Sequence, residues 1–233
     1  MNAIRTVVKM YTRGKWIWFF LPWMVLLLQF LVALIVILII ILLFGGKTLP
    51  FYPGGLITIC VIMFVLGIIT LTDTFPFALG FGVRRTDYIL GTAVMAVEVS
   101  TVTAVLWLLC SLLEIVTGGW GIELYYFHLP YFNDGSLIEQ FWVYFAVLAN
   151  MYFLGFVIGS IYQRFGRVGM LIFVLTVFLL MSLFSLVWTY LHWWGAFFAW
   201  FSQFTAFELA VGLLPLTALY LLASYLLLRR AVA

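Results

Sequence analysis

Few side chains in this sequence could perform chemistry, and their types and spacing fit no catalytic or metal-binding arrangement. The 8 carboxylates are scattered along the chain and never cluster, so they provide no acid–base pair. The two histidines, His128 and His192, and the two cysteines, Cys60 and Cys110, lack the spacing of a zinc site. No Gly-x-Ser-Gly sequence is present, as an intramembrane serine protease would need. We therefore expect no catalytic residue, no metal site and no enzymatic activity of the chain alone.

The polar groups of interest lie instead in long apolar stretches. Glu98 falls about ten residues into one of them, ~15 Å along a helix, where an unpaired carboxylate costs several kcal/mol. Asn150 lies at a similar depth in the next stretch, and we predict that the two side chains approach each other. Three roles stay open for them: an interhelical hydrogen bond worth roughly 1 kcal/mol, a polar contact in a transport path, or proton coupling. Gln203 and Glu208, near the outer end of the last stretch, either meet a partner in an aromatic loop or line an outer exit.

Two pairs of small residues also suggest contacts. Gly155 and Gly159 form a G-x-x-x-G sequence, which predicts the close approach of another helix of the same subunit. Cys60 and Cys110 fall at similar depth near the outer ends of their stretches, so a disulfide and two separate core thiols both remain open.

The composition decides the broad class of protein. Hydrophobic residues make up 67% and charged residues 8% of the chain, against about 45–50% and about 25% in soluble domains. Aromatic residues reach 20%, which excludes a disordered chain and a coiled coil. The net charge of +3 is too small and too scattered to indicate nucleic-acid binding. The sequence predicts an integral membrane protein with a single transmembrane domain over 1–233.

Six stretches are long and apolar enough to span a membrane as helices, which need about 20 residues. Gly and Pro residues mark most of the boundaries between them. The predicted spans are 19–44, 56–72, 88–113, 138–162, 168–190 and 205–228. If the amino terminus is cytoplasmic, all Lys and Arg except Lys47 fall on the inner side. We therefore predict an all-α membrane protein with six transmembrane helices and both termini in the cytoplasm.

Three further segments are expected at the membrane surfaces. Residues 1–15 place apolar and basic side chains on opposite helical faces, which favours an interfacial helix over a basic tail. The aromatic and acidic loop 118–137 can lie against the outer surface. Segment 191–204 is too apolar for a solvated loop, and we weigh a pair of short re-entrant or interfacial helices broken at Gly195 against an aromatic belt with a wet loop.

The segment 73–88, between the second and third predicted spans, is too long for a tight turn. Its apolar residues could dock on another surface, and Arg84, Arg85 and Asp87 supply a charged edge. We expect either a short helix that projects toward a cytosolic partner or an interfacial helix with a pair of positive-inside residues.

The run FPFALGFGVRRTDYILGT in this region resembles the first cytoplasmic loop of ABC-transporter permeases of the type-2 exporter group, which have the type V exporter fold. Small stand-alone permeases of this group share the plan of six spans over essentially the whole chain. The resemblance implies a coupling helix after the second span and re-entrant helices before the sixth. It also implies which residues contact the ATPase subunit: Phe77, Leu79, Phe81, Arg84, Arg85, Asp87 and Tyr88.

The resemblance further implies the partners. ATP and Mg²⁺ would bind to two copies of a separate cytosolic ATPase, so this chain would hold no cofactor itself. A second permease, identical or homologous, would complete the transporter, with the first and fifth spans meeting across the dimer. The implied function is export of an amphipathic or hydrophobic cargo (a peptide, a drug or a lipid-like molecule) across a bacterial cell membrane, in contact with lipid and not with nucleic acid.

Two other classes of function remain open on the sequence. One is a secondary transporter or channel that uses Glu98. The other is a membrane subunit that assembles or senses for other proteins without transporting anything.

Overall fold

A computed structural model describes residues 19–44 and 50–229 of the chain. The predicted interfacial helix at 1–15 lies outside the described residues. The regular structure of the described residues is helical, with one isolated bridge between Phe51 and Leu124. The helices are α2 (Leu21–Phe44), α3 (Gly55–Gly80), α4 (Arg85–Val116), η2 (Gly119–Glu123), η3 (Pro130–Phe132), α5 (Leu137–Tyr190), α6 (Trp194–Phe201) and α7 (Ala206–Arg229). The predicted all-α class is confirmed for this part of the chain.

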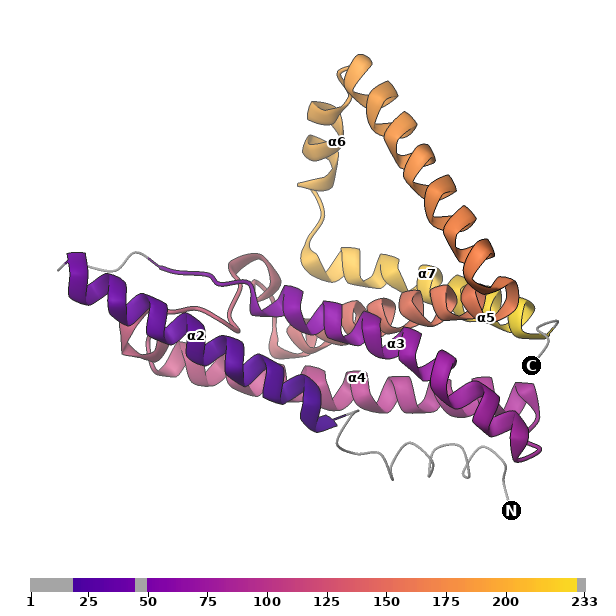
Figure 1. Cartoon of the computed structure of the whole chain (residues 1–233). Helices are drawn as coiled ribbons and strands as arrows, with labels where there is room; N and C mark the ends of the chain where they lie inside the picture. The colour runs from indigo at the N-terminus through magenta and orange to yellow at the C-terminus, as the bar shows by residue number, and fades with distance from the viewer. Residues whose placement is uncertain (1–18, 45–49, 230–233) are drawn as a thin grey trace.

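Five of the described helices are long and apolar enough to cross a membrane, namely α2, α3, α4, α5 and α7. Helices α3, α4, α7 and the first half of α5 run side by side in a bundle, and α2 lies along it (Figure 1). Large buried side chains fill its centre, among them Met63, Trp107, Tyr152 and Phe156. The long apolar helices predicted from the composition are therefore present.

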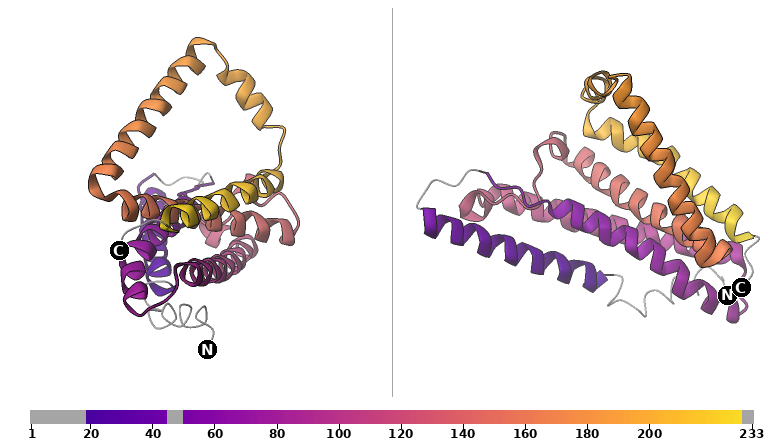
Figure 2. Two further views of the ribbon diagram at one scale, coloured as in Figure 1. Left: turned by 90° about the vertical axis from the view of Figure 1, so that its right-hand side faces the viewer. Right: turned by 45° about the horizontal axis from the view of Figure 1, so that its top comes forward.

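Helix α5 includes both the fourth and the fifth predicted spans, 138–162 and 168–190. The short loop that the sequence predicts between them is absent from this described part of the chain. Its 54 residues would measure about 80 Å if straight. At Gly166 the backbone has φ 67° and ψ −166°, a region open essentially to glycine alone. The chain changes direction there, and the second half of α5 leaves the bundle (Figure 2).

The second half of α5 and α6 form an arm, residues 167–203, that stands apart from the bundle (Figure 1). No side chain of the arm is buried in the single chain. Rings hold its far end together: Trp188 lies 5.5 Å from Trp193 and 5.9 Å from Phe197 between ring centroids. The arm therefore has a folded tip and two apolar flanks that bury no side chain against the rest of the chain.

Segment 191–204 contains one short helix and not the pair that we had weighed. Gly195 lies in the first turn of α6, so the expected break at this residue is wrong. The chain turns just before it, where His192 adopts φ 54°.

The contact between α3 and α5 is closer than ordinary side chains allow. A Cβ atom added at Gly67 would collide with the backbone oxygen of Tyr152, and one added at Gly155 with that of Phe64. A Cβ at Gly159 would lie 3.2 Å from the oxygen of Ile68. The prediction that Gly155 and Gly159 permit close packing within the subunit is confirmed.

We predict that Gly155→Val destabilises the bundle, because the added methyl groups must push α3 away from α5. Overpacking of this kind costs about 3 kcal/mol. The free energy of unfolding in mixed micelles measures the effect. Gly212→Val is the matched control, since a Cβ at Gly212 on α7 meets nothing within 4 Å. Equal unfolding free energies for the two variants would contradict the prediction.

Candidate functional site

The predicted coupling segment is the tip of a helical hairpin and not a separate helix. Helix α3 continues through Pro76 to Gly80, and α4 starts at Arg85. A proline inside a helix costs about 3 kcal/mol, but Phe75 and Ala78 on either side of it are buried and hold the helix in place. The prediction of a separate short helix between the second and third spans is therefore wrong, because these residues belong to the ends of α3 and α4.

Two phenylalanines dominate the surface of this tip. Phe77 is 57% exposed and Phe81 73% exposed, and their ring centroids lie 4.7 Å apart in an edge-to-face arrangement. Arg84 is exposed beside them, whereas Leu79 and Asp87 are half-buried. The hairpin thus presents an apolar pair next to a cation.

Tyr88 belongs to the interior of the hairpin. It has no exposed surface, and its ring packs 5.2 Å from that of Phe75. Its hydroxyl donates to the backbone oxygen of Thr70 at 3.0 Å and lies 2.7 Å from the Thr74 hydroxyl. The side chain therefore joins α3 to α4 and does not face outward.

Arg85 ties the hairpin to the end of α7. Its guanidinium donates to the backbone oxygens of Leu228 at 3.1 Å and Arg229 at 2.9 Å. These oxygens belong to the last turn of α7, where a cation is favourable. Sequence reasoning identified Arg85 as a charged edge but could not find this partner 144 residues away.

Glu98 and Asn150 do not form the predicted pair. Asn150 is 4% exposed, and its amide donates to the hydroxyl of Thr217 on α7 at 3.1 Å. Glu98 is exposed on α4 and makes no hydrogen bond to the described residues. Asn150 thus forms the interhelical hydrogen bond expected of it, but with a different helix.

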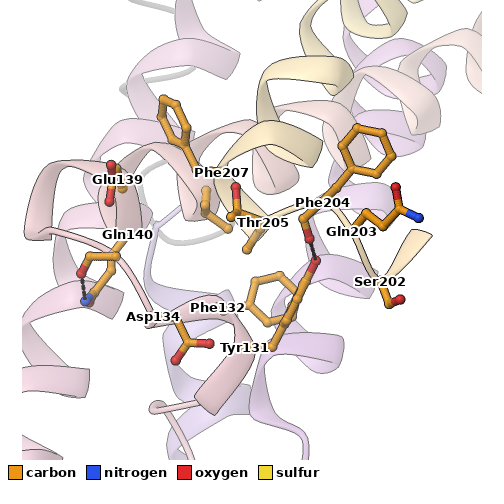
Figure 3. Close-up of a pocket in the computed structure, with 13 residues that line it drawn as sticks. Tyr131, Phe132, Asp134, Glu139, Gln140, Ser202, Gln203, Phe204, Thr205 and Phe207 are labelled. Carbon is orange, nitrogen blue, oxygen red and sulfur yellow. Dashed lines mark hydrogen bonds between the residues drawn. The ribbon is translucent and has the colours of Figure 1, made fainter. Parts of the chain in front are cut away.

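Glu208 and Gln203 lie where α6 leads into α7. The Glu208 carboxylate accepts a hydrogen bond from the Thr205 amide at 2.9 Å, and the Thr205 hydroxyl accepts from the Glu208 amide at 3.3 Å. This reciprocal pair is a capping box. Gln203 lines a cavity of about 290 Å³ beside it (Figure 3).

The residue that sequence reasoning missed is Glu114, in the last turn of α4. It has no exposed surface, and its carboxylate accepts four hydrogen bonds. The donors are the indole of Trp120 at 2.8 Å and the backbone amides of Tyr126 at 2.7 Å, Phe127 at 2.8 Å and His128 at 2.6 Å. Charge-assisted hydrogen bonds of this kind are the strong ones, so Glu114 fixes the fold of the loop 118–137.

The loop 118–137 also contacts α2. The hydroxyl of Tyr126 donates to the side-chain oxygen of Gln29 at 3.0 Å, and Phe30 packs 5.5 Å from the Tyr126 ring. Burial raises the pKa of Tyr126 to about 12. The hydroxyl of Tyr126 therefore joins the loop to α2 as a hydrogen-bond donor.

Buried amides extend the order of the loop toward α5. Asn133 donates to Ser111 at 2.8 Å and to Gln140 at 3.1 Å, and it accepts from Tyr144 at 2.6 Å. Gln140 donates in turn to the backbone oxygen of Gly135 at 2.8 Å. The carboxyl end of α4 and the amino end of α5 are thus joined through one polar network, and the loop 118–137 is folded into the bundle.

Cys60 and Cys110 are free thiols, each half-buried, so the structure contains no disulfide between them. Among residues 19–44 and 50–229, no group of three or more His, Cys, Asp or Glu side chains could hold a metal ion.

Comparison of the chain with models of protein families, with curated proteins and with solved structures finds no match. The class of protein rests on the fold alone: the chain is helical, and several of its helices are long and apolar enough for a membrane protein.

We predict that Glu114→Gln lowers the free energy of unfolding by about 3 kcal/mol, because a glutamine amide presents a donor to backbone donors and removes the charge. Thermal unfolding and protease cleavage within 118–137 measure the loss. Glu123→Gln is the matched control, since the Glu123 side chain is exposed in the same loop. Unchanged unfolding and cleavage in Glu114→Gln would show that the carboxylate does not hold the loop.

Proposed function

We propose that this chain is the membrane-spanning permease subunit of an ATP-driven exporter, and that a separate cytosolic ATPase docks on the hairpin between α3 and α4. The exposed pair of Phe77 and Phe81 beside Arg84 is the observation on which the proposal depends. Large apolar side chains in the aqueous phase usually mark an interaction surface.

The lengths of the helices support an aqueous position for this tip. Helix α3 has 26 residues and α4 has 32, or about 39 Å and 48 Å, against a hydrocarbon layer of about 30 Å. The excess falls at the hairpin, where Asp73, Arg84, Arg85 and Asp87 lie. A soluble protein can therefore reach the two rings.

The topology that we propose has six spans, with the two halves of α5 crossing separately. Arg164 and Arg167 flank the bend at Gly166, which lies at the same end of the bundle as the hairpin and the carboxyl end of α7 (Figure 1). All described Arg side chains are then on one side of the membrane, as the positive-inside rule requires of the cytoplasmic side. The resemblance of the α3–α4 segment to small bacterial permeases leads us to propose a bacterial cell membrane as its location.

A second permease copy would cover the arm. Residues 167–203 form an apolar helix and a short return helix without a buried side chain. Packing against an equivalent arm removes this surface from lipid and gives the closed symmetry that most oligomers have. An amphipathic or hydrophobic cargo, such as a peptide, suits the apolar walls of such a dimer.

Site-specific photo-crosslinking tests the proposed partner. A photoreactive residue at position 77 in the full chain, expressed in its native membrane, should give an adduct with a protein that contains a nucleotide-binding domain. The same residue at position 116, which is 84% exposed at the outer end of α4, should not. Adducts with lipid alone at position 77 would refute the docking surface.

We predict that Phe81→Ala reduces co-purification of the ATPase subunit at least fivefold and leaves thermal unfolding unchanged, because the ring is exposed. Tyr88→Phe should have the opposite pattern: it removes the hydroxyl's bonds inside the hairpin and lowers stability by about 1 kcal/mol, with the docking surface intact. Val116→Ala is the control for loss of an exposed apolar side chain. Normal co-purification of Phe81→Ala would contradict the prediction.

One observation favours a gradient-driven transporter as a second candidate. The Glu98 carboxyl group is exposed on α4 within the apolar part of the bundle, where ionisable groups often mark a transport path. This candidate predicts flux without ATP that Glu98→Gln abolishes. The ATP-driven exporter predicts no flux in vesicles that lack the ATPase.

A further inference from the structure

A cavity opens at the outer end of the molecule, where the loop after α4 meets the connection between α6 and α7 (Figure 3). Its volume is about 290 Å³. Rings form much of its wall, and the hydroxyl of Tyr131 closes one side by donating to the backbone oxygen of Phe204 at 2.8 Å. The aromatic lining residues are Tyr131, Phe132, Phe204 and Phe207, and the polar ones include Asp134, Glu139, Ser202 and Gln203.

The charge of this cavity is negative. Asp134 and Glu139 contribute carboxylates, and no described residue that lines it is Lys, Arg or His. The Asp134 carboxylate makes no hydrogen bond to the described residues and is exposed. All described Arg side chains lie at the hairpin, the Gly166 bend or the end of α7, which is the opposite end of the bundle.

The helix ends beside the cavity do not reverse this charge. Helices α5 and α7 both begin here, and each amino terminus carries about half a positive charge. At the start of α5, the Glu139 carboxylate accepts a hydrogen bond from the Ser136 amide at 2.7 Å. At the start of α7, the Glu208 carboxylate accepts one from the Thr205 amide. Each partial positive charge therefore faces a full carboxylate already, and an anionic ligand would meet a net negative wall.

An apolar groove adjoins the cavity. It encloses about 510 Å³ between α3, α5 and the outer loop. Its lining residues are Gly54, Leu56, Ile57, Cys60, Val61, Phe64, Leu129, Phe132, Val147 and Met151. Phe132 lines both hollows. Along α5, Glu139 and Val143 belong to the cavity, and Val147 and Met151 continue the same row into the groove at steps of four residues.

We propose that these two hollows form one binding site for an amphiphilic organic cation. Its amine or quaternary ammonium head lies in the cavity among the rings and the carboxylates, and its hydrocarbon tail lies in the groove. Aromatic faces attract such cations as carboxylates do. The combined space falls within the range of about 300–1,000 Å³ typical of small-molecule sites.

This site deepens the proposed export function, on which its role as a cargo site rests, by giving the amphiphile a positive charge. Binding itself does not require transport or an ATPase. A chain that binds the cation but captures no ATPase would refute only the exporter, and the reverse result would refute only this site.

The test uses the full chain in dodecyl maltoside micelles and titration calorimetry, with empty micelles subtracted. Decyltrimethylammonium should bind, and decyl sulfate, with the same tail and opposite charge, should not. The double variant Asp134→Asn/Glu139→Gln should weaken cation binding at least tenfold. Glutamine at position 139 can maintain the capping box, so the start of α5 remains folded. Glu123→Gln, which removes another exposed outer carboxylate, should bind as the unaltered chain does.

The tail contact has its own pair of variants. Val61→Trp fills the groove from its exposed side and should weaken decyltrimethylammonium at least tenfold while leaving tetramethylammonium unaffected. Val65→Trp, one turn further along α3 and outside the groove, should weaken neither.

Three results would overturn the proposal. The first is equal binding of decyltrimethylammonium and decyl sulfate, which indicates partition into the micelle. The second is an equal loss of affinity in the double variant and in Glu123→Gln, which indicates general surface attraction. The third is displacement of decyltrimethylammonium by phosphatidylethanolamine at equal concentration, which assigns the site to a lipid headgroup.

Discussion

The hydrogen bonds of the Glu114 carboxylate are the interaction on which the loop 118–137 and its contacts with the bundle depend. Three successive backbone amides and an indole converge on it, so the loop after α4 turns inward instead of running over the surface. This turn places Tyr126 against α2 and Asn133 between α4 and α5. Leu129 and Phe132 then become walls of the groove and the cavity. A single buried charge, fully hydrogen-bonded, thus organises a segment that has almost no regular secondary structure.

Much of the fold could be predicted because a membrane restricts the secondary structure that a spanning segment can adopt. Apolar stretches of sufficient length must be helical, since lipid leaves no other partner for backbone groups. The boundaries of α2, α4 and α7 accordingly lie within a few residues of the predicted ones. The closeness of α3 to α5 was also visible in Gly155 and Gly159. Composition and spacing are sufficient for these features because each depends on neighbours along the same helix.

The partners of individual polar groups could not be predicted in the same way. Hydropathy indicates how deep Glu98 and Asn150 lie along their helices. It does not indicate which face each helix turns to its neighbours, because that depends on packing, and in the structure the two side chains face different surroundings. Arg85 meets the end of α7 through the arrangement of three helices. The signal for Glu114 was present, because a carboxylate just before a glycine-rich loop needs donors and the loop amides need an acceptor. The second span was predicted to end at residue 72, but buried neighbours of Pro76 keep α3 helical as far as Gly80.

The bend at Gly166 makes the arm a lever with a pivot one residue wide. The 24 residues from Arg167 to Tyr190 extend about 36 Å from it, so each 10° of rotation about the Gly166 backbone shifts the far end by roughly 6 Å. Between Gly166 and the connection from α6 to α7, where Tyr131 binds Phe204, no buried side chain of the arm opposes such a rotation. In the topology that we propose, the surroundings of the arm in the membrane therefore set its angle, and a small change of packing at the pivot becomes a large displacement of the far end.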